Sequence, residues 1–263
     1  MPISQSFGKA LNTRLTRVNL LGCQVSQGSY QAILDSIMEL GAANRSSYVC
    51  FANVHMLYEA NHDINFQKIV NRADLVCPDG RPLSILMRWQ YGIRQQRACG
   101  MDLFPDILSE ASRRGLSVFF YGSTPELLDQ LCVKVKQTYP DLILAGAYSP
   151  PFRQLTPRED AEVIEMINQR KADFVFVSLG CPKQEQWMNE HLGSINACML
   201  GLGQAFKTFT GVEKRLPGWA RNLSLEWLYR LWLEPRRLWK RYLAGNSWFL
   251  YKAGRVMLTG KKR

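Results

Sequence analysis

The stretch 116–140, LSVFFYGSTPELLDQLCVKVKQTYP, decides the predicted fold. It begins with a continuous apolar run, turns at Gly122, and continues with apolar residues at helical spacing. Thr124 is a favourable N-cap and Pro125 suits the first helical position, so a helix is predicted to begin there. A buried strand that leads directly into a helix is the repeating unit of a parallel sheet.

The same alternation of strand and helix extends in both directions from this stretch. The apolar fraction of 46% is sufficient for a large core. We therefore predict an α/β fold, a Rossmann-like, mostly parallel sheet with helices on both faces, plus a helical C-terminal appendage. Further strands are expected within 16–22, 47–54, 74–80, 141–150, 172–180 and 197–203. Further helices are expected within 26–41, capped by Ser26 or Ser29, and within 56–73, 84–92, 101–115, 156–171 and 181–193.

Positive charge is concentrated at the end of the chain. Residues 214–263 hold 13 of the 33 lysines and arginines against two acids, Glu226 and Glu234, which accounts for the net charge of +11. The same segment holds five of the seven tryptophans. We therefore predict a core at 1–213 and, at 214–263, a basic Trp/Arg-rich appendage that docks on an anionic membrane surface.

The sequence lacks the motifs that define several classes of protein. No run approaches about 18 apolar residues, and the first residues lack the apolar core of a signal peptide, so a cytoplasmic chain is expected. The seven cysteines form no C-x-x-C pair, which predicts small core residues rather than disulfides or a zinc site. A full G-x-G-x-x-G and a P-loop are absent, which argues against a dehydrogenase or an NTPase. No D-x-D is present to hold Mg²⁺, and we expect neither a metal nor a cofactor.

Polar residues and glycines follow several predicted strands, where ligands of parallel sheets bind. Asn53, Asp79 and Gly122 each end a strand, and Gly122 could cradle a phosphate or a sugar. Asp79 lies in LVCPDGRPL, and turn chemistry alone would explain an aspartate there. Lys183 and Gln184 open a helix whose N-terminus could bind an anion, although an ordinary turn would look the same.

Five segments together resemble a known family. NVHMLYEA, ADLVCPDG, RACGMDLF, GCPKQEQW and RLPGWARNLSLEWLYRLWLEPRRLWKRYL occur in the order found in the bacterial WecG/TagA/CpsF glycosyltransferases. The resemblance covers roughly residues 20–250. It implies an inverting, metal-independent transfer from a UDP-sugar donor to a polyprenyl-diphosphate-linked sugar acceptor, in the synthesis of cell-surface polysaccharides. It also implies a protein peripheral on the inner face of the cell membrane.

The resemblance assigns roles to several residues. Asp79 matches the proposed general base, a role for which a strand-end carboxylate is suited. Arg230 and Arg237 match arginines proposed to hold the diphosphate, and Lys240 stands where a third arginine is often found. The remaining matches are the sugar-binding Asn53, the glutamine Gln184, and the R-x-x-G-x-D residues Arg97, Gly100 and Asp102, whose role is unassigned.

Two positions depart from the family pattern and leave the donor sugar open. Phe51 replaces a frequent threonine, and Lys207 replaces a frequent aspartate. The donor could thus carry N-acetylmannosamine or a different hexose. Two other functions fit the basic aromatic tail: a nucleic-acid binder and a non-catalytic membrane scaffold. A nucleic-acid binder gives CPDG and PKQE no role, so we expect no nucleic-acid partner. A scaffold would tolerate the loss of Asp79, whereas an enzyme would not. The oligomeric state stays open, a homo-oligomer included.

Overall fold

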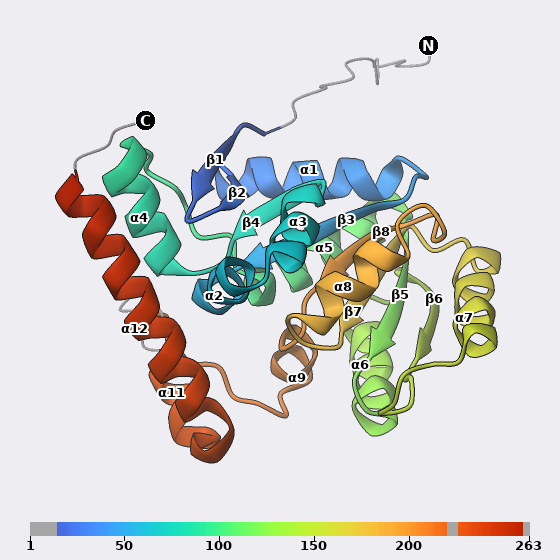
Figure 1. Ribbon diagram of the computed structural model, residues 1–263. Helices are drawn as coiled ribbons and strands as arrows, with labels where there is room; N and C mark the ends of the chain where they lie inside the picture. Colours follow the sequence, from blue (N-terminus) through green and yellow to red (C-terminus); the bar gives the residue numbers. More distant parts are fainter. Residues whose placement is uncertain (1–14, 220–225, 260–263) are drawn as a thin grey trace, which may run out of the picture.

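A six-stranded parallel sheet forms the centre of the molecule. The computed structural model describes residues 15–219 and 226–259 (Figure 1). The strand order is β4-β3-β8-β7-β5-β6, and every neighbouring pair is parallel. The predicted fold class is confirmed. The strands are β3 (Ser47–Ala52), β4 (Leu75–Pro78), β5 (Ser117–Gly122), β6 (Ile143–Tyr148), β7 (Phe174–Ser178) and β8 (Cys198–Gly201).

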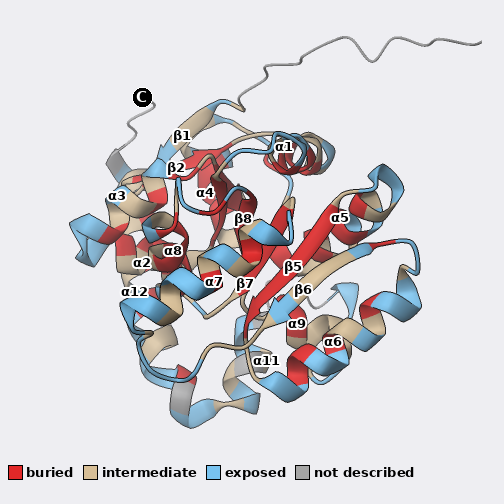
Figure 2. Ribbon diagram, turned by 90° about the vertical axis from the view of Figure 1, so that its right-hand side faces the viewer, coloured by how far each residue is buried: buried red, intermediate tan, exposed pale blue. Residues whose placement is uncertain are grey.

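Helices cover both faces of the sheet. Side chains alternate along β3, so that Tyr48 and Cys50 enter one core and Val49 and Phe51 the other. Figure 2 shows β5 and β7 buried between helices whose outer faces are exposed. One face carries α2 (Val54–His62), α3 (Ile64–Arg72), α4 (Arg81–Tyr91), α7 (Pro157–Gln169) and α8 (Lys183–Glu190). The other carries α1 (Tyr30–Ala42), α5 (Gly100–Arg114), α6 (Pro125–Thr138) and α9 (Ala205–Thr210).

Most predicted helix ends are confirmed. Ser29 caps α1, and its hydroxyl accepts a hydrogen bond from the backbone N–H of Ala32. Thr124 caps α6 with Pro125 in the first turn, and Thr156 begins α7 with a full capping box. Gly115 ends α5 in the left-handed conformation. Five of the seven cysteines are buried, as expected for core residues.

Two local predictions were wrong. The single helix expected within 56–73 is two helices, because Asp63 ends α2 and its carboxylate accepts from the N–H groups of Asn65 and Phe66 to begin α3. The single strand expected within 16–22 is a hairpin of β1 (Arg17–Leu20) and β2 (Cys23–Ser26), which forms a separate antiparallel sheet. Ser26, one of the two proposed caps, lies in β2.

The C-terminal part of the chain is helical, as predicted. α11 (Glu226–Leu233) is followed by α12 (Pro235–Thr259), which packs against α2 and α4 (Figure 1). The indole N–H of Trp248 donates to Asn61 Oδ1 at 3.2 Å. Phe249 and Ala253 are buried in the core on this face. Within 15–219 and 226–259, no helix combines the length and the apolar character that a bilayer-crossing helix needs.

Candidate active site

The carboxyl ends of β3 and β4 bring Asn53 and Asp79 together. The two strands pair with Ala52 opposite Pro78, and the backbone N–H of Asp79 donates to the Ala52 carbonyl at 2.9 Å. Asn53 caps α2, because its side-chain oxygen accepts from the N–H groups of His55 and Met56 at 3.1 and 3.2 Å. Gly80, the residue after Asp79, is the N-cap of α4. Both predicted residues therefore occupy one edge of the sheet, at the starts of two helices.

The segment that leads into α5 lies against Asp79. The N–H of Ala98 donates to the Pro78 carbonyl at 2.9 Å, which fixes this segment to the end of β4. Burial raises the pKa of the Cys99 thiol well above its usual value, and the charge of Asp79, together with a hydrogen bond to its carboxylate, raises it further. The thiol therefore stays protonated as a donor to Asp79. A Cβ at Gly100 would lie 2.9 Å from Leu202, so the packing excludes a larger residue there.

Asp102 binds two arginines at the beginning of α5. Its Oδ2 accepts from Arg97 Nη2 at 2.9 Å, and its Oδ1 accepts from Arg215 Nη1 at 2.6 Å. Burial alone would raise the pKa of Asp102, but hydrogen bonds and charge from Arg215 and Arg97 hold it below its usual value. The R-x-x-G-x-D segment is thus an ion-pair group beside Asp79. Arg215 was not among the predicted site residues, although it lies in the RLPGW stretch of the family-like tail.

The ends of β5, β7 and β8 are held together by backbone geometry. Gly122 has φ of +102°, and a Cβ there would lie 2.5 Å from the Ser178 carbonyl oxygen. The N–H of Ser123 donates to the same carbonyl at 3.0 Å, and the Ser178 hydroxyl donates to the Gly203 carbonyl at 2.7 Å. Glycine at position 122 is therefore required by the backbone, whether or not a ligand binds beside it.

Gln184 joins the β7–α8 turn to β8. Its side-chain N–H₂ donates to the Gly201 carbonyl at 2.9 Å and to Glu185 Oε1 at 2.8 Å, and its oxygen accepts from the Gly180 N–H at 3.2 Å. The side chain is buried, with 6% of the residue exposed. These contacts show how Gln184 supports the edge of the sheet, and its contact with a substrate stays a prediction. Lys183, at the start of α8, is exposed.

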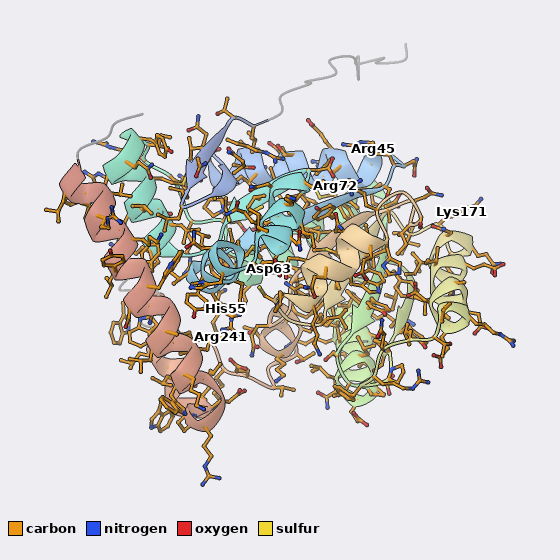
Figure 3. The ribbon with its side chains drawn as sticks, viewed as in Figure 1. Arg45, His55, Asp63, Arg72, Lys171 and Arg241 are labelled. Carbon is orange, nitrogen blue, oxygen red and sulfur yellow. The ribbon has the colours of Figure 1, made fainter. Side chains whose placement is uncertain are left out.

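Glu185 is a fully buried carboxylic acid that sequence analysis did not single out. Burial raises its pKa from 4.5 to about 7, while hydrogen bonds from Gln184 and Cys181 and the charge of Arg241 partly oppose that rise. Its Oε2 has no hydrogen-bond partner among the described residues. Arg241 lies on α12, which packs against α2, and Figure 3 labels it together with His55 of α2. The C-terminal helix thus brings positive charge toward the β7–α8 turn.

The predicted tail residues are described in part. Arg230 lies on α11 and Arg237 on α12, but their side chains are outside the described part of the structure. Lys240 is exposed, and its ammonium lies 5.6 Å from the centre of the Trp239 ring. In the described ranges, no three His, Cys, Asp or Glu side chains are grouped as metal ligands.

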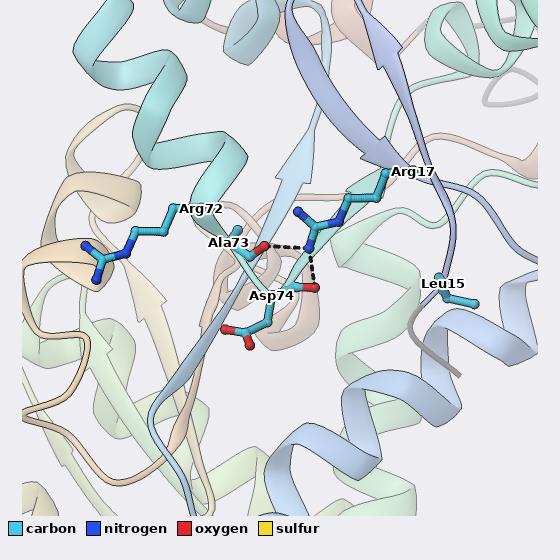
Figure 4. A pocket seen from close by; sticks show the side chains of 5 residues that line it. All are labelled: Leu15, Arg17, Arg72, Ala73 and Asp74. Carbon is cyan, nitrogen blue, oxygen red and sulfur yellow. Dashed lines mark hydrogen bonds between the residues drawn. The ribbon is translucent and has the colours of Figure 1, made fainter. Parts of the chain in front are cut away.

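A cavity of about 390 Å³ lies at the other edge of the sheet, where β4 begins (Figure 4). Arg17 crosses it and donates to the carbonyls of Ala73 and Asp74 at 2.6 and 2.5 Å. Leu15 and Arg72 complete the lining. None of the predicted site residues lines this cavity. The candidate active site therefore remains at the carboxyl ends of the strands.

The fold and this edge define the class of protein. Parallel α/β proteins of the Rossmann type bind ligands at the carboxyl ends of their strands, where Asn53, Asp79 and the Arg97–Asp102–Arg215 group lie. The chain belongs to the glycosyl transferase WecG/TagA/CpsF family, whose model matches residues 18–263.

Three relatives of this chain are named for the same activity. The N-acetylglucosaminyldiphosphoundecaprenol N-acetyl-beta-D-mannosaminyltransferase of Bacillus spizizenii is 31% identical over 202 residues, 76% of each chain. The protein of the same name from Bacillus subtilis (strain 168) is 32% identical over 193 residues, 73% of each chain. That from Staphylococcus aureus (strain NCTC 8325) is 26% identical over 253 residues, 94% of this chain and 95% of the relative.

Proposed function

We propose that the chain transfers a hexose or an N-acetylhexosamine, such as N-acetylmannosamine, from a UDP-sugar to a polyprenyl-diphosphate-linked acceptor. By the names of its relatives, the acceptor sugar is N-acetylglucosamine and the lipid is undecaprenol. The product serves the synthesis of cell-surface polysaccharide. The observation that carries this proposal is the position of Asp79, a carboxylate at the carboxyl edge of a parallel sheet beside Asn53, in a chain of a glycosyl transferase family.

Asp79 acts as the general base in this proposal. Its carboxylate takes the proton from the acceptor hydroxyl while that oxygen attacks the anomeric carbon of the donor. The bond from the anomeric carbon to the UDP oxygen breaks as the new glycosidic bond forms. A single displacement of this kind inverts the anomeric configuration. Asn53 orients the donor sugar beside the base.

Positive side chains of the C-terminal helices balance the charge on the leaving UDP. Arginine forks match phosphate oxygens in geometry and charge, which suits Arg230 and Arg237 to this role. Lys240 and Lys183 add further positive charge in this proposal. Because the sequence has no D-x-D, these residues take the place of a metal ion in the proposal.

The appendage at 214–263 also docks the enzyme on the membrane that holds its lipid-linked acceptor. Several of its large apolar side chains are exposed, among them Trp232 at 76% and Leu250 at 70%. α12 contains no acidic residue, so it presents only positive charge to anionic headgroups. Tryptophan prefers the headgroup level of a bilayer, which adds an apolar contribution that salt does not screen.

A donor panel tests the proposed substrate class. UDP-sugars that bind should raise the unfolding temperature of the full chain, whereas UMP and GDP-sugars should do so far less. Phe51, where the family often has threonine, is buried near the end of β3. Its ring lies 3.4 Å from the position that a Cβ on Gly100 would occupy, so it leaves less space there than a threonine would. UDP-N-acetylmannosamine, UDP-N-acetylglucosamine and UDP-glucose should therefore be compared directly. Equal protection by all nucleotides, or by none, would count against the proposal.

A further inference from the structure

Arg215 connects the loop after α9 to the start of α5. This loop leads from the core into the C-terminal helices. Arg215 Nη1 donates to Asp102 Oδ1 at 2.6 Å, and its Nη2 lies 3.9 Å from Cys99 Sγ. The side chain is 22% exposed, so most of it is withdrawn from water. An ion pair of this length and burial holds its two segments more firmly than an exposed pair.

The partner of Arg215 is shared with Arg97. Both oxygens of Asp102 are used, one by each guanidinium. Asp102 therefore fixes two things at once: the segment 97–102 and the first residues of the appendage.

The same segment touches Asp79. The N–H of Ala98 donates a hydrogen bond to the Pro78 carbonyl, and the Cys99 thiol donates one to the Asp79 carboxylate. The titratable groups around Asp79 include Cys77 on β4 and, from the segment and the loop, Arg97, Cys99, Asp102 and Arg215. Burial and the charge of Asp79 raise the pKa of both thiols, so both stay protonated. Removing Arg215 would take one positive charge away from the surroundings of Asp79.

We propose that Arg215 is a positioning residue for the transfer reaction: it fastens the start of the appendage beside the catalytic strand end and adds a positive charge that favours the ionised form of Asp79. Its side chain acts through Asp102 and Cys99 rather than on the substrate. This inference rests on the proposed role of Asp79 as the base.

The test is the pH dependence of kcat/KM for the full chain, with UDP-N-acetylmannosamine and a short-chain GlcNAc-diphospholipid as substrates. Arg215→Ala and Arg215→Gln remove the charge, and the glutamine keeps a donor for Asp102 if the alanine variant does not fold. Arg215→Lys keeps the charge. Arg45→Ala is the matched control, because Arg45 pairs with Asp74 at 3.1 Å at the opposite edge of the sheet.

Losing a positive charge close to a carboxylate raises the pKa of that carboxylate, so a base remains protonated to higher pH. We expect kcat/KM to fall roughly tenfold in the neutral variants, with the acidic limb moved upward by about half to one pH unit. In Arg215→Lys the limb should stay in place while part of the rate is lost. The Arg45→Ala profile should match the wild type.

Two results separate the failure of this inference from the failure of the proposed function. If Asp79→Asn retains full turnover, the base assignment itself is wrong. If Asp79→Asn is inactive and a folded neutral variant of Arg215 keeps the wild-type limb, Arg215 has only a structural role. A double variant with Asp102→Asn gives an independent measure, because the two losses should be less than additive if they share one group.

Discussion

Glu185 makes the stability of this protein depend on pH in an unusual direction. The unfolded chain ionises this residue near 4.5, whereas the folded protein does so at about 7 because the carboxyl is buried. Between these two pH values the folded state holds a proton that the unfolded state has released. The folded state therefore loses stability as pH rises through this window. The free energy of unfolding is not reduced below the pKa of the unfolded chain, and it is fully reduced above the pKa of the folded protein.

The size of the effect follows from the shift. A difference of about 2.5 pH units corresponds to about 3 kcal/mol at roughly 1.36 kcal/mol per unit. Glu185→Gln keeps the shape of the side chain and an oxygen for the Gln184 hydrogen bond, but it carries no charge at any pH. The difference in unfolding free energy between the variant and the wild type should therefore increase by about 2 to 3 kcal/mol, in favour of the variant, when the pH is raised from about 5 to about 8.

Urea unfolding followed by tryptophan fluorescence measures this difference. The control is Glu165→Gln, which alters an exposed glutamate that also accepts a hydrogen bond from a glutamine, Gln169. Any constant effect of the substitution on packing cancels, because only the change with pH is compared. If wild type and Glu185→Gln keep the same stability difference at both pH values within about 0.5 kcal/mol, the buried carboxyl is not the source of the dependence.

Three further results are expected. Sugar transfer should survive EDTA, since the proposal assigns the charge balance on UDP to arginines; activity that returns only on adding Mg²⁺ or Mn²⁺ would contradict this. The double variant Trp232→Ser, Leu250→Ser should sediment less with anionic vesicles, while its turnover on a soluble acceptor stays unchanged. Arg237→Ala should lower turnover and leave vesicle sedimentation unchanged. If both variants lose vesicle binding and turnover to the same extent, the two roles of the tail are not separable. Gly122→Ala should cost about 1 to 3 kcal/mol of unfolding free energy, because φ is +102° and the new Cβ would meet the Ser178 carbonyl. Gly254→Ala, which meets nothing within 4 Å, should be neutral or slightly stabilising, and a similar loss in both would reject the strain argument.

Local patterns were sufficient to predict most of the fold. Thr124–Pro125 and Thr156–Pro157 each combine an N-cap with a residue suited to the first helical turn, and both helices begin where expected. The continuous apolar runs of β3 and β5 indicated strands buried on both faces. The break at Asp63 was missed because apolar residues continue at helical spacing on both sides of it. Asp63 nevertheless caps a new helix.

The site was harder to predict, because its contacts are distant in sequence. Asn53 and Asp79 were each predicted to end a strand, and the pairing of β3 with β4 brings them together. Arg215 and Asp102 are 113 residues apart, so no local pattern links them. Glu185 looked like a helix-opening acid in PKQE, and only the packing of α8 shows that it is fully buried.

Replacement of Asp79 by asparagine tests the central claim most directly. The substitution keeps the size of the side chain, and the backbone bond to Ala52 does not depend on it. We expect single-turnover transfer from the UDP-sugar to the GlcNAc-diphospholipid to slow by about 10²- to 10⁴-fold, with the unfolding temperature and donor binding nearly unchanged. Transfer by the folded variant at the wild-type rate would show that Asp79 is not the base.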